Sequence, residues 1–201
     1  MLEPRDRQLL FDVLRPPEGF RFDQGLGTTY SLDLLALLMA PLAFTWFEQP
    51  GEEGQRSGFD SLEVLESLRR HADRLTIFCH AGRTALPKTS YPQLAFVEKS
   101  IVECQPAHGA AFHPKVWVLR CVNDSHDVRY RVLCLSRNLT FSRSWDTILA
   151  LDGTFVASRT ATVARNRGLV EFVRALPRVA LRQPIDPGIA LELLRRQLHP
   201  E

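Results

Sequence analysis

One short segment brings together two residue types that act on phosphate groups. Residues 112–119 read Phe-His-Pro-Lys-Val-Trp-Val-Leu, and their alternation is typical of a β-strand. Residues two apart in a strand project from the same face, so we expect His113 and Lys115 to point to one side together. An imidazole can attack phosphorus or donate a proton, and an ammonium can stabilise charge on the non-bridging oxygens.

A second strand-like segment ends in a hydroxyl and an amide. Residues 133–140 read Leu-Cys-Leu-Ser-Arg-Asn-Leu-Thr, and by the same rule Ser136 and Asn138 share a face. If the two strands are neighbours in a sheet, these side chains meet those of His113 and Lys115 at one spot. The four groups together make a good phosphate site, which predicts phosphoryl-transfer chemistry.

The two segments resemble the motif of the phospholipase D superfamily, which is His-x-Lys and then a Gly/Ser-x-Asn segment. His113-Pro114-Lys115 matches the first part and Ser136-Arg137-Asn138 the second. The resemblance is best over residues 74–153. It implies that His113 is a nucleophile that forms a phosphohistidine, that Lys115 and Asn138 hold the phosphate, and that no metal or other cofactor is used.

Two positions depart from the family pattern, and one role has two candidates. Arg120 stands where the family often has Asp, and Leu135 replaces the glycine that usually precedes the serine. The family also has an acidic residue before the next strand, which orients the histidine. Asp146 is the candidate for this role and Asp152 the weaker alternative, because an imidazole needs its second nitrogen hydrogen-bonded to fix its tautomer.

Four further residues are candidates for binding substrate around this centre. His80 ends a predicted strand, a place where open α/β sheets put ligand loops, and Arg83 follows it closely. A solvated loop is the alternative interpretation for this pair. His108 lies in a Gly/Ala-containing loop before the histidine motif, and Arg137 lies inside the second motif.

Other residues with chemical potential are expected to be structural. Trp117 and Trp145 flank the two motifs and are predicted to pack in the core. For Trp145 the alternative interpretation is that it stacks a base. His71 is predicted to lie on a helix surface. Residues 123–127, Asn-Asp-Ser-His-Asp between two strands, indicate a hairpin turn.

The periodicity of the chain changes between helix and strand several times. Helices are predicted over residues 5–14, 32–47 with Ser31 as N-cap, 61–72, 160–176 and 189–198. Strands are predicted over residues 20–30 with a turn at its glycines, 74–79, 93–103, 113–122, 130–135, 147–151 and 179–181. This mixture predicts an α/β fold, a phospholipase D-like mixed sheet flanked by helices on both faces. We expect a single domain over residues 1–201, with its core at about 20–176 and a C-terminal helical tail at about 184–201.

The composition narrows the class of protein. The chain has 201 residues, of which 45% are hydrophobic and 24% charged, and these are ordinary globular values. A net charge of +2 is too small by itself to imply a nucleic-acid partner. The most apolar stretch, residues 32–47, is shorter than the roughly 20 residues of a spanning helix, so no membrane association is expected. The four cysteines lie in apolar runs and no export signal begins the chain, which predicts buried, reduced thiols in a cytoplasmic protein.

The sequence contains one copy of a motif whose mechanism uses two histidines. It therefore predicts a homodimer that shares an active site, or a second half encoded elsewhere. The leading hypothesis is a metal-independent DNA nuclease or phosphodiesterase, nearest to restriction and anti-phage defence nucleases, with DNA preferred over RNA. One alternative is a non-catalytic domain of this fold that dimerises or binds nucleic acid within a larger defence or repair protein. Another is a metal-dependent hydrolase that uses His108, His113 and Asp124.

Overall fold

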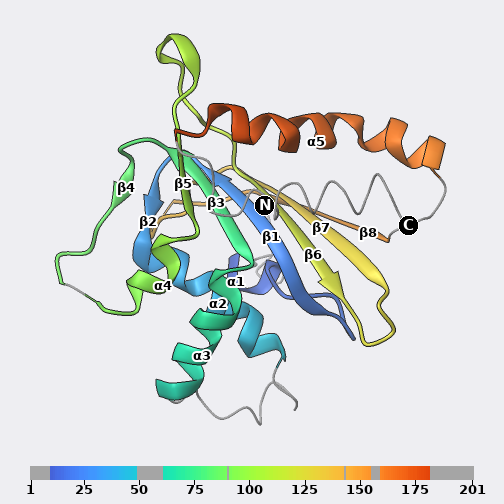
Figure 1. Cartoon of the computed structure of the whole chain (residues 1–201), viewed down its shortest axis with the longest axis horizontal. Coiled ribbons are helices and arrows are strands. Elements are labelled where there is room, and N and C mark those ends of the chain that lie inside the picture. Colours follow the sequence, from blue (N-terminus) through green and yellow to red (C-terminus); the bar gives the residue numbers. More distant parts are fainter. Residues whose placement is uncertain (1–9, 49–60, 90, 143, 155–158, 182–201) are drawn as a thin grey trace.

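A six-stranded mixed sheet forms the centre of the chain (Figure 1). The computed structural model describes residues 10–48, 61–89, 91–142, 144–154 and 159–181. In spatial order the strands are β5 (Ile101–Cys104), β3 (Leu75–His80), β1 (Arg21–Thr29), β6 (Val116–Val122), β7 (Val128–Leu135) and β8 (Ile148–Thr154). The first three are mutually parallel, and each later strand is antiparallel to its neighbour. Short strands β2 (Leu32–Asp33) and β4 (Thr84–Ala85) pair separately.

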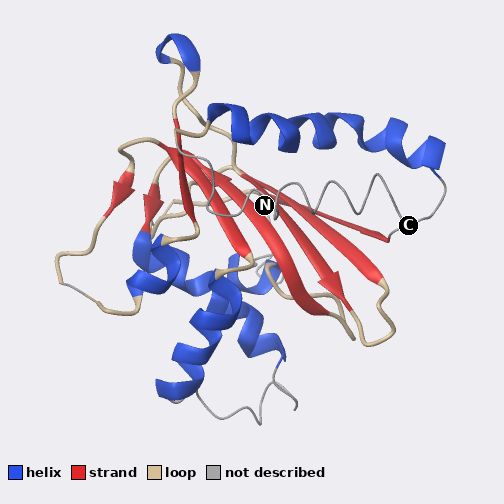
Figure 2. Cartoon of the chain, in the orientation of Figure 1, coloured by secondary structure: helices blue, strands red, loops and turns tan. Residues whose placement is uncertain are grey.

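Helices cover both faces of the large sheet, as predicted (Figure 2). The helices on one side are α1 (Leu10–Val13), α2 (Leu34–Glu48), α3 (Ser61–Ala72) and α4 (Leu94–Glu98), and α5 (Arg159–Val179) lies on the other. Successive strand residues therefore join different cores. Ile77 and Leu119 pack in the cluster that contains α2, whereas Phe78 and Val118 pack against α5. Among the described residues, no helix has the length and apolar character needed to cross a membrane.

Several predicted elements differ from the structure in a way that bears on the site. Strand β6 begins at Val116, so His113 and Lys115 lie in the segment that leads into the strand rather than inside it. Residues 93–103 were predicted as strand throughout, but α4 occupies the first half, and only β5 is extended. The N-cap of α2 is Asp33 instead of Ser31, because the Asp33 carboxylate accepts the Leu35 N–H at 2.9 Å. The predicted helix over 189–198 and the tail at 184–201 lie outside the described residues.

Strand β1 is continuous, without the turn predicted at its glycines. Gly27 instead permits close packing at the centre of the sheet. A Cβ atom there would lie 2.7 Å from Ile77 Cδ1 and 3.1 Å from the nearest ring atoms of Trp117. The glycine therefore marks a close approach between side chains from β3 and β6.

We expect Gly27→Val to lower the free energy of unfolding by about 2 kcal/mol, because the added methyl groups overpack this contact. Gly153→Val in edge strand β8 is the matched control, since nothing lies within 4 Å of the Cβ position there. Urea denaturation of both variants measures the difference. Equal midpoints for the two variants would show that the core accommodates the extra volume.

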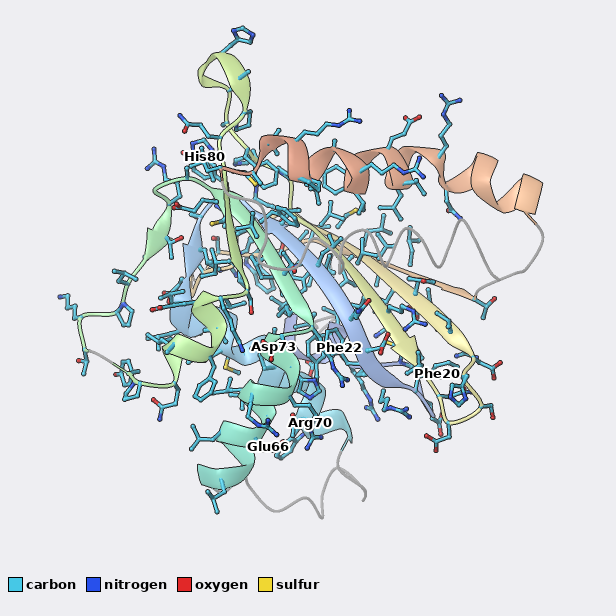
Figure 3. The ribbon with its side chains drawn as sticks, in the orientation of Figure 1. Phe20, Phe22, Glu66, Arg70, Asp73 and His80 are labelled. Atoms are coloured by element: carbon cyan, nitrogen blue, oxygen red, sulfur yellow. The ribbon has the colours of Figure 1, made fainter. Side chains whose placement is uncertain are left out.

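His71 is buried, which contradicts its predicted place on a helix surface. It is only 1% exposed, and its ring packs edge-on against Phe22 and Phe44. Figure 3 shows Phe22 of β1 close to the helical layer that carries Arg70. Burial, with smaller effects from Arg70 and Arg74, lowers the pKa of His71 to about 4.

This depressed pKa makes the stability of the fold depend on pH. In the unfolded chain the imidazole has its ordinary pKa of 6.5, so the unfolded state binds a proton more readily than the folded state. The contribution is therefore intact above pH 6.5 and is lost as the pH falls toward 4. We expect the parent to lose about 2 kcal/mol of unfolding free energy between about pH 6.5 and 5 from this group. In His71→Leu that loss should disappear, while the exposed-residue variant His126→Asn should keep it; identical slopes for His71→Leu and parent would contradict the assignment.

The thiols are partly as predicted. Cys79, Cys104 and Cys121 are buried, but Cys134 is exposed, and none of the four forms a disulfide with another described residue. Cys134 lies in β7 on the α5 side of the sheet, opposite Leu149 of edge strand β8. Leu149 is itself 54% exposed, so this part of the face is not covered by other side chains.

Candidate active site

Four segments of the chain meet at one edge of the sheet. Because β1 and β3 are parallel and β6 is antiparallel to β1, the carboxyl ends of β1 and β3 lie beside the amino end of β6. Strand β7 pairs with β6, and Val116 opposite Cys134 sets the register. The two motif strands are therefore neighbours, as expected, and the residues before β6 lie beside those that follow β7.

His113 and Lys115 are in direct contact at this edge. The Lys115 ammonium nitrogen lies 3.0 Å from Nδ1 and 3.2 Å from Nε2 of His113, and it donates to the His113 carbonyl at 3.3 Å. The ammonium therefore lies against the imidazole, whose neutral form has one nitrogen lone pair that can attack phosphorus. His113 is exposed and Lys115 is half-buried, and burial lowers the pKa of the lysine.

Tyr30 connects the groups at this edge, and the sequence did not identify it. Its ring centroid lies 5.1 Å from that of His113 and 5.2 Å from that of His80. The Arg83 guanidinium carbon lies 5.4 Å from the same ring centroid. The Tyr30 backbone N–H donates to Asn138 Oδ1 at 3.3 Å. Its position directly after a central parallel strand was the available signal, because such strand ends carry ligand loops.

A tight turn after β3 presents His80 and Arg83. The Arg83 N–H donates to the His80 carbonyl at 3.1 Å, and Gly82 supplies the positive φ of 70° between them. The Gly82 N–H donates to Glu103 at 2.9 Å, which fixes the turn. His80, labelled in Figure 3, accepts the Phe112 N–H on Nδ1 at 3.2 Å, so its neutral ring carries the proton on Nε2.

Asp146 organises the second motif and does not contact the histidine ring. Its Oδ1 accepts the Ser136 N–H at 2.9 Å, the Ser136 hydroxyl at 2.7 Å and the Arg137 N–H at 3.0 Å. The Ser136 oxygen in turn accepts the Thr147 N–H at 2.9 Å. The structure thus places this carboxylate on the turn that carries Asn138, instead of the predicted position beside His113.

The structure also places Asp152 and Arg120 in ion pairs away from His113. The Asp152 carboxylate forms a two-pronged ion pair with Arg131 at 2.6 and 2.7 Å, away from His113. Arg120, which replaces the family's usual Asp, is buried and paired with Asp23 at a bulge in β1. It lies well along β6 from the motif, so its charge stabilises the pairing of β1 with β6 and is not a group of the site.

The remaining candidates are not assembled around His113 by any described contact. His108 is exposed in the short 3-10 turn Ala107–Gly109, which projects beyond the sheet (Figure 1). Asp124 pairs with Arg21 at 2.7 Å in the β6–β7 hairpin, at the opposite end of these strands. The hairpin prediction is confirmed, and a metal site built from His108, His113 and Asp124 would need groups from opposite ends of the sheet. Trp117 is buried as predicted, but Trp145 is exposed, which contradicts its predicted place in the core.

The fold is that of the phospholipase D superfamily. Among solved structures it is similar to yeast tyrosyl-DNA phosphodiesterase, a member of that superfamily, with a TM-score of 0.54 and 15% identity over 96% of this chain and 38% of the other. Mutant forms of the yeast enzyme align with a TM-score of 0.52, one at 13% identity over 94% of this chain and 36% of that one, and another at 15% over 87% and 35%. This chain thus spans well under half the length of the solved chains. No family model matches the sequence, and no curated protein matches it.

Proposed function

We propose that the chain is a metal-independent phosphodiesterase that cleaves DNA through a covalent intermediate on His113. The observation that carries the proposal is the exposed His113 imidazole held by Lys115 at the edge where Asn138 also lies. The imidazole attacks phosphorus, the bond to the leaving oxygen breaks, and that oxygen takes a proton from a second imidazole. Water then attacks the phosphohistidine and gives its proton to the second imidazole, and the bond from phosphorus to His113 breaks, which releases the phosphate product and restores both rings.

The polar side chains around Tyr30 can bind phosphate groups of a DNA backbone. Arg83 is exposed and rests on the Tyr30 ring, and His80 has a fixed N–H available on Nε2. Both can donate to non-bridging oxygens of the reacting phosphate or its neighbour, and arginine suits such oxygens through its bidentate fork. The choice of DNA rests on the substrate named for the yeast neighbour.

The second imidazole comes from a second copy of the chain. A two-fold dimer places His113 of both copies near the axis, and one can protonate the leaving oxygen. Strand β8 offers a surface for this contact. It is the edge strand of the sheet, it begins beside the site through the pairing of Ile148 with Leu135, and Leu149 and Leu151 are each 54% exposed on it. Exposed apolar side chains on an edge strand are typical of an interface.

We expect the double variant Leu149→Glu, Leu151→Glu to be monomeric and to lose DNA cleavage, because buried carboxylates would oppose the contact. Leu86→Glu is the matched control, since Leu86 is 73% exposed and lies in the loop after β4. Light scattering gives the mass, and a cleavage assay gives the activity. A monomeric parent, or a double variant that still dimerises and cleaves, would refute this interface.

Labelled single- and double-stranded DNA incubated with the parent protein in excess EDTA tests the activity. Cleavage under these conditions would support a metal-independent phosphodiesterase. If DNA is bound but never cleaved, with or without added metal, the chain is a non-catalytic binding domain of the same fold. Restriction and anti-phage defence do not form part of the proposal, since the structural neighbours are DNA phosphodiesterases of another kind.

A further inference from the structure

Two large aromatic side chains are exposed on one loop beside the candidate site. The loop connects the second motif to β8, and its described residues, 139–142 and 144–146, are called the aromatic loop below. Phe141 is 61% exposed and Trp145 is 76% exposed. Phe141 lies three residues after Asn138, and Trp145 immediately precedes Asp146. Rings of this size are normally buried in a core or an interface, so their exposure here indicates a binding role.

Both ends of the aromatic loop are fixed to the sheet edge. At the start, Leu139 is buried, its N–H donates to Thr29 at 3.0 Å, and its carbonyl accepts the Asp33 N–H at 2.9 Å. At the end, Asp146 accepts the hydroxyl of Ser136. These contacts fix both ends of the aromatic loop beside the turn that carries Asn138.

Arg137 braces the middle of the same loop. Its guanidinium donates to the Ser142 carbonyl, although the sequence suggested that this side chain binds substrate directly. The Ser142 and Ser144 hydroxyl oxygens are 2.7 Å apart, which adds a second internal hydrogen bond. These two contacts restrain the loop around Ser142, which reduces the entropy lost when a ligand binds there.

We infer that the aromatic loop stacks unpaired nucleobases next to the scissile phosphate, so that the substrate is a single-stranded polynucleotide. The inference rests on the proposed function. Every base has a flat π-face, and stacking on aromatic side chains holds single strands without sequence preference. In a duplex those faces are covered by neighbouring bases. Lys115 and Arg83 would hold the backbone, so the phosphates and the bases of one strand would contact different groups at the same edge.

Binding of a labelled oligothymidylate to the inactive His113→Ala protein tests the inference without requiring turnover. We expect Phe141→Ala and Trp145→Ala each to weaken binding by about tenfold, in line with stacking energies for single bases. A strand of the same length made of abasic residues should bind the parent and both variants equally. Trp145→Phe should recover most of the affinity, and Tyr91→Ala, which removes an exposed aromatic ring on the segment before α4, should bind as the parent does.

Three results would overturn the inference. Unchanged affinity in both alanine variants would show that the rings do not touch the bases. An equal loss on the abasic strand would show that they act on the backbone or on the fold. Conversion of a dimer to a monomer by Trp145→Ala would assign the ring to the interface between copies. If the parent cleaves DNA in EDTA while the alanine variants bind normally, the role given to the aromatic loop is wrong and the proposed function stands. If binding depends on the bases and on both rings but the parent never cleaves DNA, the role of the loop stands and the proposed function is wrong.

Discussion

Replacing His113 by alanine is expected to abolish DNA cleavage in excess EDTA, with a loss of about 10⁴-fold or more. In the proposed mechanism the exposed His113 imidazole, which Lys115 contacts at the sheet edge, is the nucleophile. Alanine removes the attacking atom, so the covalent step has no substitute within the chain. Single-turnover cleavage of labelled DNA measures the loss.

His126→Asn is the matched control for that experiment. His126 is exposed in the β6–β7 hairpin and has a φ of 65°, a conformation that asparagine adopts readily. We expect its activity to equal that of the parent. A His113→Ala protein that cleaves at the parental rate would remove His113 from the mechanism, whereas equal losses in both variants would indicate a general effect on the fold.

Replacing Lys115 by methionine is expected to slow cleavage by about 10²- to 10³-fold, the usual loss for one donor aimed at developing charge. Methionine keeps the length and most of the volume of the side chain, so the effect should lie in the rate and not in stability. Lys115 is half-buried, and its ammonium is partly desolvated, which strengthens its interaction with a phosphoryl oxygen. Lys99→Met, at an ion pair with Asp73 away from the site, should cleave normally.

We expect the lowered pKa of Lys115 to set the alkaline side of the rate profile. Burial favours the neutral amine, so the lysine loses its proton below the ordinary value of 10.5. We expect cleavage to decline as the pH rises toward that value, and Lys115→Arg to extend activity to higher pH because arginine stays charged. A decline at the same pH in both proteins would attribute the alkaline limb to another group.

The periodicity of apolar residues correctly predicted individual helices and strands. Helix α3 spans residues 61–72 as the spacing indicated, and the alternation around Trp117 located β6 to within a few residues. Both features depend on residues close in sequence. The phosphate site was expected only if the two motif strands were neighbours, and the pairing of β6 with β7 meets that condition.

The predictions that were wrong or incomplete concern side chains whose contacts come from other segments of the chain. His71 was predicted to lie on a helix surface, yet its ring packs against Phe22 and Phe44. Tyr30 was not identified because its partners come from three other strand ends. Asp146 was predicted to orient the histidine, but its partner is a serine ten residues earlier.

The stereochemical course of cleavage tests the central claim, covalent catalysis by His113, most directly. The substrate is an oligonucleotide with one phosphorothioate linkage of known configuration, cleaved by the parent protein in water labelled with heavy oxygen. Each in-line displacement at phosphorus inverts its configuration. Attack by His113 followed by attack of water makes two displacements, so we expect overall retention. Inversion would mean that water attacks the diester directly, and a phosphohistidine on His113 would then be excluded.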